Sequence, residues 1–308
     1  MRNNSLDIAK GIGIILVVIG HCISGTSILG KCISSVHMPL FFLISGLCFN
    51  EIKHANLIPF FKQRFRQILV PCFLFTAIFI TISPAVSIYK LKYGLPGSLW
   101  FLLILFIIAI LYSVLHKITE KCYGSNYLLV YILFLCLLIS GEIYYHDISL
   151  PYKIHNIPGA IFYYGIGHQL KHTNIISFIQ KTKNSLSSII IAIVLLILPF
   201  THGILRNEPY YSLSSCILAI GGCISIIIIS KFIEKNTFNK IFIWLGKNTL
   251  YIMALNMLFI ELSCILIQPL VDNYLIYKVI EQIFVWLLCI IPIPAINKYF
   301  PTLVGKYK

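Results

Sequence analysis

Four ionisable residues lie in two apolar stretches near the start of the chain: Asp7, Lys10, His21 and His37. An ionisable side chain inside a lipid bilayer costs free energy, so its presence usually indicates a function. A histidine that stays neutral there can remove a proton from a hydroxyl group as a general base. His21, His37 and Asp7 are therefore candidate catalytic residues, although a hydrogen bond to a neighbouring helix would also explain either histidine.

Helical geometry places three of these residues on one face of the first apolar helix. At 100° per residue, Lys10 lies within about 20° of His21, and Asp7 within about 40°. Asp7 lies roughly 21 Å from His21 along the axis, too far to orient the imidazole, so we expect Asp7 to pair with Lys10 instead. Glycines in the same helix predict the close approach of a neighbouring helix. They are Gly11, Gly13 and Gly20.

Composition identifies the class of protein. Of the 308 residues, 58% are hydrophobic and only 11% are charged. The mean hydropathy of +0.90 is far above that of soluble domains. We predict an all-α, polytopic membrane protein that forms one domain over residues 1–308, with the lipid bilayer as its partner. Nucleic acid is not expected as a partner, because the positive charge follows the loops of a membrane protein.

Ten apolar segments are long enough to cross a membrane. They cover residues 8–28, 32–50, 68–88, 99–116, 127–143, 157–170, 186–202, 211–232, 241–268 and 275–297. The sixth is short and rich in Gly and Tyr, which is typical of broken, tilted or re-entrant segments. With the N-terminus inside the cell, 18 of the 24 Lys and Arg fall on the cytoplasmic side, so both termini are predicted to be cytoplasmic. The first segment is predicted to be a retained span rather than a cleaved signal.

Two further polar groups stand out along the chain. Lys62, Arg64 and Arg66 alternate with phenylalanines before the third segment, as in an interfacial helix that could hold a phosphorylated ligand. Anchoring to anionic lipid headgroups is the alternative. Asn256 lies inside the ninth segment, where hydrogen bonding between helices explains it as well as chemistry does.

Cysteine usage gives no sign of a metal centre. Most of the ten cysteines lie in apolar runs, where they act as small hydrophobic residues. The sequence has no CxxC pair and no Cys/His ligand spacing of that kind, so no metal cofactor is expected.

Several of these motifs together resemble the membrane acyltransferase-3 superfamily, close to its sugar O-acetyltransferase branch of fucose 4-O-acetylase-like proteins. The run LDIAKGIGIILVVIGH followed by VHMPLFFLISG is similar to the two first motifs of that family. The matching positions are Asp7, Lys10, Gly11, His21, Phe42, Ser45 and Gly46, followed by Arg64 and Arg66, Leu99 to Phe101, and Leu245 to Thr249.

The resemblance implies a multi-pass enzyme of the bacterial inner membrane. Such an enzyme transfers an acyl group, usually from cytosolic acetyl-coenzyme A, to a hydroxyl of a cell-envelope or exported glycan. His21 would be the general base, and three cations would bind the donor: Lys10, Arg64 and Arg66. Ser45, Trp100 and Asn256 are the expected substrate-binding residues. Asn256 stands where the family often has a histidine, so it is expected to orient the acceptor rather than transfer a proton.

Two other classes of function use the same residues. A transporter or flippase for a polysaccharide or a lipid-linked sugar would line its path with ionisable groups. No internal repeat supports that alternative. A pure assembly partner would have little reason to keep ionisable residues in lipid. The sequence specifies neither the acceptor sugar nor an oligomeric state.

Overall fold

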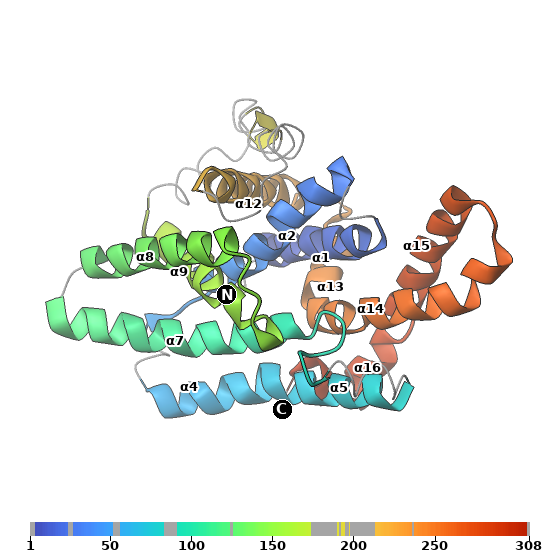
Figure 1. Cartoon of the computed structure of the whole chain (residues 1–308), viewed down its shortest axis with the longest axis horizontal. Coiled ribbons are helices and arrows are strands. Elements are labelled where there is room, and N and C mark those ends of the chain that lie inside the picture. The colour runs from blue at the N-terminus through green and yellow to red at the C-terminus, as the bar shows by residue number, and fades with distance from the viewer. Residues whose placement is uncertain are drawn as a thin grey trace.

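A computed structural model of the chain describes residues 4–23, 27–51, 56–82, 91–123, 126–173, 213–235 and 237–306, with five further positions between 190 and 197. The described residues form helices and no strands (Figure 1), as the composition predicts. The helices are α1 (Asn4–Cys22), α2 (Ile28–Leu47), α4 (Leu57–Arg64), α5 (Val70–Ile82), α7 (Trp100–Tyr123), α8 (Asn126–Tyr145), α9 (Ile157–His172), α12 (Leu213–Ile233), α13 (Asn239–Lys247), α14 (Thr249–Leu266), α15 (Tyr274–Ile290) and α16 (Ile293–Tyr299). Shorter turns are η1 (Phe65–Leu69), η2 (Pro151–Asn156), η3 (Gln268–Leu270) and η4 (Pro301–Val304).

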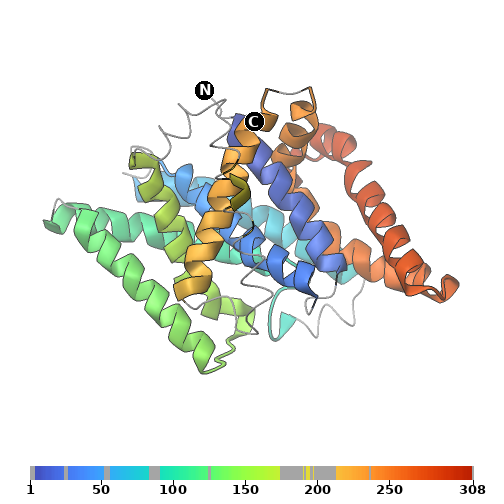
Figure 2. The ribbon, with the colours of Figure 1, turned by 90° about the horizontal axis from the view of Figure 1, so that it is seen from above.

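Helix α1 lies at the centre of the bundle. It packs against α2, α12, α13, α14 and α15, and it is surrounded by other helices in Figures 1 and 2. Its aliphatic residues Ile8, Ile14 and Val18 have no exposed surface. The first apolar segment therefore forms the core of the protein, and its polar residues are held among neighbouring helices rather than in lipid.

Small residues bring α1 and α13 into backbone contact. A Cβ atom at Gly11 would collide with the carbonyl oxygen of Phe242, and one at Gly246 would collide with that of Asp7. Each helix thus supplies a glycine at the point where the other helix crosses it. This confirms the close approach that the glycines of the first segment predict.

Glycines also bring the backbones of α2 and α9 into contact. A Cβ atom at Gly46 would collide with the carbonyl oxygen of Tyr164, and one at Gly167 would collide with that of Leu43. Helix α9 is regular over its 16 residues and mostly buried. The sixth segment is therefore a short, intact helix inside the bundle, which excludes the broken form among the three predicted alternatives.

Two other segments differ from the predicted spans. The ninth is divided at Asn248, where the backbone leaves the helical region at φ −116° and ψ 15° and separates α13 from α14. The Asn248 side chain donates to the Trp244 carbonyl and accepts from Asn297, and these bonds stabilise the bend. The basic run, expected as a separate interfacial helix, instead continues through a π-helical turn over Phe65–Leu69 into α5.

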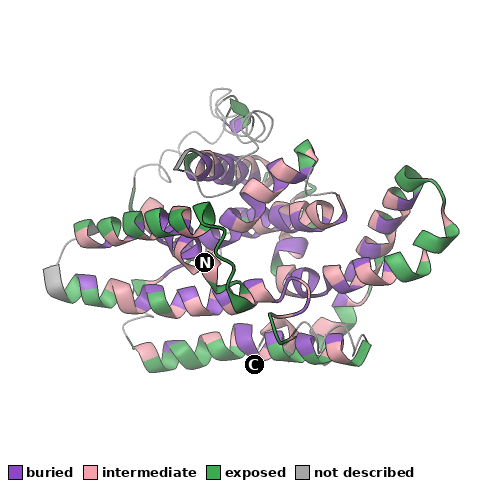
Figure 3. Ribbon diagram, in the orientation of Figure 1, coloured by how far each residue is buried: buried purple, intermediate pink, exposed green. Residues whose placement is uncertain are grey.

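Eight helices among the described residues are long and apolar enough to cross a membrane. They correspond to eight of the ten predicted segments; α9 is shorter, and the seventh segment lies mostly outside the described residues. Exposed apolar side chains cover α8 and α15 on opposite flanks (Figures 2 and 3), including Phe134, Leu138, Val279 and Ile283. Such continuous apolar faces suit lipid rather than water.

Candidate functional site

His21, in the last turn of α1, makes a hydrogen bond to a helix far along the chain. Its Nδ1 atom lies 2.7 Å from Oδ1 of Asn256 on α14. Asn256 is fully buried, and its amide nitrogen donates to the carbonyl oxygens of Ile252 and Met253 at 2.9 and 2.8 Å. Because the amide nitrogen is committed to those carbonyls, the amide oxygen must face His21.

This arrangement fixes the tautomer of the neutral His21 ring. An amide oxygen only accepts hydrogen bonds, so Nδ1 of His21 carries the proton and donates it to Asn256. Nε2 then has a free lone pair, as a general base requires. Asn256, predicted to bind substrate, accepts the hydrogen bond that orients the His21 ring.

His37 lies beside His21 on α2. The two ring centroids are 6.3 Å apart and the rings are nearly perpendicular. Nδ1 of His37 lies 2.8 Å from the carbonyl oxygen of Ile33, one turn earlier, so it donates there and leaves its own Nε2 as an acceptor. The two predicted histidines therefore lie together, each presenting a basic nitrogen.

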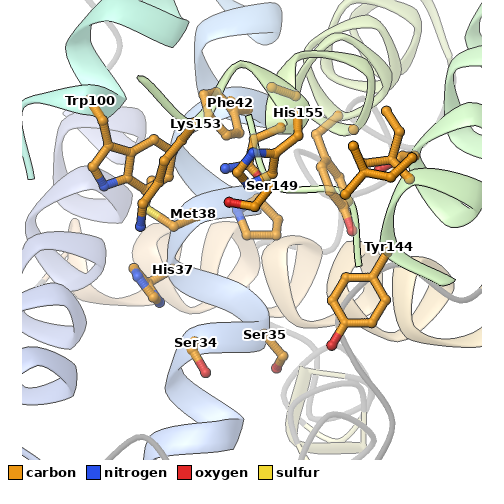
Figure 4. A pocket seen from close by; sticks show the side chains of 18 of the residues that line it. Ser34, Ser35, His37, Met38, Phe42, Trp100, Tyr144, Ser149, Lys153 and His155 are labelled. Carbon is orange, nitrogen blue, oxygen red and sulfur yellow. The ribbon is translucent and has the colours of Figure 1, made fainter. Parts of the chain in front are cut away.

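His37 lines a cavity of about 470 Å³, the outer cavity, which lies between α2, α7, α8, η2 and α9 (Figure 4). This volume is within the roughly 300–1,000 Å³ of ordinary ligand sites. Hydroxyl, aromatic and charged groups line it, and His21 does not. The lining includes Ser34, Ser35, Phe42, Trp100, Ser140, Tyr144, Asp147, Ser149, Lys153, His155, Asn156 and Tyr163.

The rim of the outer cavity has a strained backbone. Asp147, Tyr152 and Lys153 have φ angles of 50°, 56° and 55°, which side-chain-bearing residues rarely adopt. The Tyr152 hydroxyl donates to the Leu91 carbonyl and holds this rim in place. Lys153 Nζ then lies 4.8 Å from the centre of the Trp100 ring, and partial desolvation there lowers the pKa of its ammonium group.

A second cavity of about 120 Å³, the inner cavity, is lined by predicted donor-binding residues. Lys10, Ser45, Cys48, Arg64, Ile68, Leu105, Ala109 and Tyr164 surround it. Arg64 Nε and the Tyr164 hydroxyl are buried and have no hydrogen-bond partner among the described residues. Buried donors without partners are costly, so a ligand with acceptor atoms would stabilise this cavity.

The other predicted site residues lie in different parts of the structure. Asp7 lies 3.9 Å from Lys10 at the far end of α1 from His21, which confirms the expected pair. Ser45 lines the inner cavity, but its hydroxyl donates to the Phe41 carbonyl. Arg66 is exposed and is absent from the lining of the inner cavity.

One helical turn separates the two cavities. On α2, Phe42 lines the outer cavity and Ser45 the inner one, and on α9 the neighbours Tyr163 and Tyr164 divide in the same way. The rings of Phe42 and Phe101 pack 5.0 Å apart. The two cavities share no lining residue, so they are separate cavities in this structure.

Several lining residues have no signal in the sequence. Lys153, Asp147 and Tyr164 reach the cavities through a strained loop and through contacts between distant helices, which no local spacing encodes.

A family model described as an acyltransferase domain matches residues 3–296, nearly the whole chain. No curated protein and no solved structure matches the chain significantly.

Proposed function

Because the chain belongs to the membrane acyltransferase-3 family, we propose that it transfers an acetyl group from cytosolic acetyl-coenzyme A to a hydroxyl group of a cell-envelope or exported glycan in the bacterial inner membrane. The observation that carries this proposal is the 2.7 Å hydrogen bond between His21 and Asn256. It leaves a basic nitrogen next to His37, which lines the outer cavity.

In the proposed reaction, His21 Nε2 takes the proton of the acceptor hydroxyl while its oxygen attacks the thioester carbonyl carbon. The new C–O bond forms first, and collapse of the tetrahedral intermediate breaks the C–S bond. The sulfur leaves with the proton that His21 holds, which gives free coenzyme A and regenerates the neutral histidine. Asn256 keeps Nδ1 protonated throughout, so the base retains its orientation.

The inner cavity is the proposed entrance for the donor. Lys10 and Arg64 are cations, and the Tyr164 hydroxyl is a further donor. Acetyl-coenzyme A has phosphate and amide oxygens that accept such bonds. His21 does not line the inner cavity, so productive binding requires this cavity to open toward His21 and admit the thin pantetheine arm.

The outer cavity is the proposed acceptor site. Its serines and Asn156 match the hydroxyl groups of a sugar, and Trp100 offers a flat apolar face to a sugar ring. His37 lies in its wall, where its free Nε2 can accept a hydrogen bond from a neighbouring hydroxyl of the acceptor sugar and hold the sugar near His21.

The test uses purified protein, acetyl-coenzyme A and the de-O-acetylated envelope glycan of the native host. We expect the release of coenzyme A thiol to depend on the glycan, and His21→Ala to lower the rate by about 10²- to 10⁴-fold. His146→Ala is the matched control, because His146 is an exposed histidine on the loop after α8.

Two results contradict the proposal. Full turnover by His21→Ala would exclude it as the base, provided that the variant is monodisperse and melts like the wild type. Movement of the glycan across vesicle membranes without release of coenzyme A would favour the transporter alternative, which the family match does not support.

A further inference from the structure

Three side chains converge where the end of α2 meets the end of α9, outside the lining of both cavities. Nε2 of His168 and Nε2 of His172 lie 3.3 Å apart, and each lies 3.1 Å from Oε1 of Glu51. His168 is buried, whereas His172 and Glu51 are about half exposed. We propose that this cluster, Glu51–His168–His172, binds a Zn²⁺ ion.

The three distances fit a tetrahedral zinc ion. Zinc binds imidazole nitrogen at about 2.0–2.1 Å and carboxylate oxygen at about 2.0–2.2 Å, so two ligand atoms on a regular tetrahedron lie about 3.3–3.5 Å apart. The observed triangle has sides of 3.1, 3.1 and 3.3 Å. Two histidines and one carboxylate are also a known ligand set for zinc with an open fourth position.

The helices hold the ligands in place before any ion binds. His168 and His172 are four residues apart on α9, so they project from the same face of the helix. Glu51 follows α2, whose backbone is locked against α9 at Gly46. The ammonium group of Lys171 donates to the Phe49 carbonyl and fixes the chain just before Glu51.

A second group orients the buried ligand. The Tyr112 hydroxyl lies 2.9 Å from Nδ1 of His168, on the opposite side of the ring from Nε2. When Nε2 binds a metal, Nδ1 carries the proton and donates a hydrogen bond to the Tyr112 oxygen, as metal-bound histidines usually do to an outer group. Phe49 packs against the same ring at 4.6 Å and restricts its rotation.

The exposure of His172 and Glu51 indicates where the rest of the coordination shell lies. Both face solvent, so water can fill the fourth position. The ion would join the ends of α2 and α9 one turn beyond Cys48 and Tyr164, which line the inner cavity. This inference stands on its own geometry and does not depend on the proposed acyl transfer.

The test is a calorimetric titration of ZnCl₂ into full-length protein, purified without a polyhistidine tag and freed of metal by dialysis. We expect one ion per chain. His172→Ala and Glu51→Gln should each weaken binding by about 100-fold or more, since even the loss of an outer partner costs 10- to 100-fold. His146→Ala is the matched control and should bind like the wild type, because His146 pairs only with Glu142 among the described residues.

A second measurement separates ligation from a folding defect. Zinc should raise the melting temperature of the wild type and of His146→Ala but leave that of His172→Ala unchanged. Tyr112→Phe should weaken zinc binding by about tenfold while the metal-free protein melts normally. Absence of stoichiometric binding, or wild-type affinity in both His172→Ala and Glu51→Gln, would show that the cluster is held by hydrogen bonds alone.

Discussion

The outer and inner cavities lie in one helical bundle but differ in size and in chemistry. The outer cavity, of about 470 Å³, has hydroxyl and aromatic walls and a rim formed by the strained segment 147–153. The inner cavity, of about 120 Å³, has two cations and a buried tyrosine. Its walls come from α1, α2, α4, η1, α7 and α9, and glycine contacts lock α2 to α9 there.

This difference indicates which side of the protein can vary. A backbone contact at Gly46 admits no larger side chain, so the shape of the inner cavity tolerates little change. The rim of the outer cavity is a loop, and loops accept substitutions and insertions readily. A fixed inner site suits a donor common to many reactions, and an adjustable outer site suits acceptors that differ. Kinetic constants for the two substrates test this division.

Among the variants that compare the two cavities, the largest effect is expected from Asn256, which lines neither of them. Asn256→Ala removes the acceptor for His21 Nδ1, so we expect kcat to fall by about 10²-fold with little change in either KM. Asn256→Asp keeps an oxygen near Nδ1 and should recover part of the rate. Steady-state kinetics with both substrates measure this. A rise in the acceptor KM at unchanged kcat would instead place Asn256 in the acceptor site, as the sequence predicts.

The second largest effect is expected from Arg64, on the KM for the donor. Hydrogen bonds to charged groups are worth about 1.5–3 kcal/mol, so Arg64→Ala should raise the donor KM by about 10- to 100-fold and leave the acceptor KM unchanged. Arg66→Ala is the matched control and should change the donor KM less than twofold, since Arg66 is exposed outside the inner cavity. Equal effects of both substitutions would mean that the two arginines attract the donor through their positive charge and not through a contact in the inner cavity.

These residues show what the sequence contains and what it omits. Asp7 and Lys10 are three residues apart, so helical geometry alone predicts their pairing. Arg64 and Arg66 are both predicted to bind the donor, but they are two apart on a helix and point in nearly opposite directions, and only Arg64 lines the inner cavity. Local spacing thus predicts the helices and the directions of their side chains.

Contacts between distant helices are not encoded in this way. His21 and Asn256 are 235 positions apart, and no periodicity identifies one as the partner of the other. From the sequence, Asn248 is compatible with a continuous helix. The bend between α13 and α14 follows from the bonds of its side chain to the Trp244 carbonyl and to Asn297. His168 and His172 have the spacing of two ligands on one helical turn, but Glu51 joins them only through the packing of α2 on α9.

On the outer side, Trp100 is the counterpart of Arg64. Trp100→Ala removes the aromatic wall of the outer cavity, and we expect the acceptor KM to rise by about tenfold while the donor KM stays the same. Trp100→Phe keeps an aromatic face and should recover most of the affinity. A change in the donor KM alone would contradict the assignment of the acceptor to the outer cavity and of the donor to the inner cavity.

The smallest effect concerns Lys153, whose ammonium group lies 4.8 Å from the centre of the Trp100 ring. Such contacts are worth about 0.5–1 kcal/mol, so Lys153→Met should raise the acceptor KM by about two- to fivefold at neutral pH. Partial desolvation lowers the pKa of Lys153, and the group is mostly charged only below that pKa. The wild-type acceptor KM should therefore rise as Lys153 loses its proton, and this rise should occur at a lower pH than the deprotonation of an ordinary lysine. The acceptor KM of Lys153→Met should not show this rise. The same pH step in both proteins would assign it to another group and leave Lys153 without a part in acceptor binding.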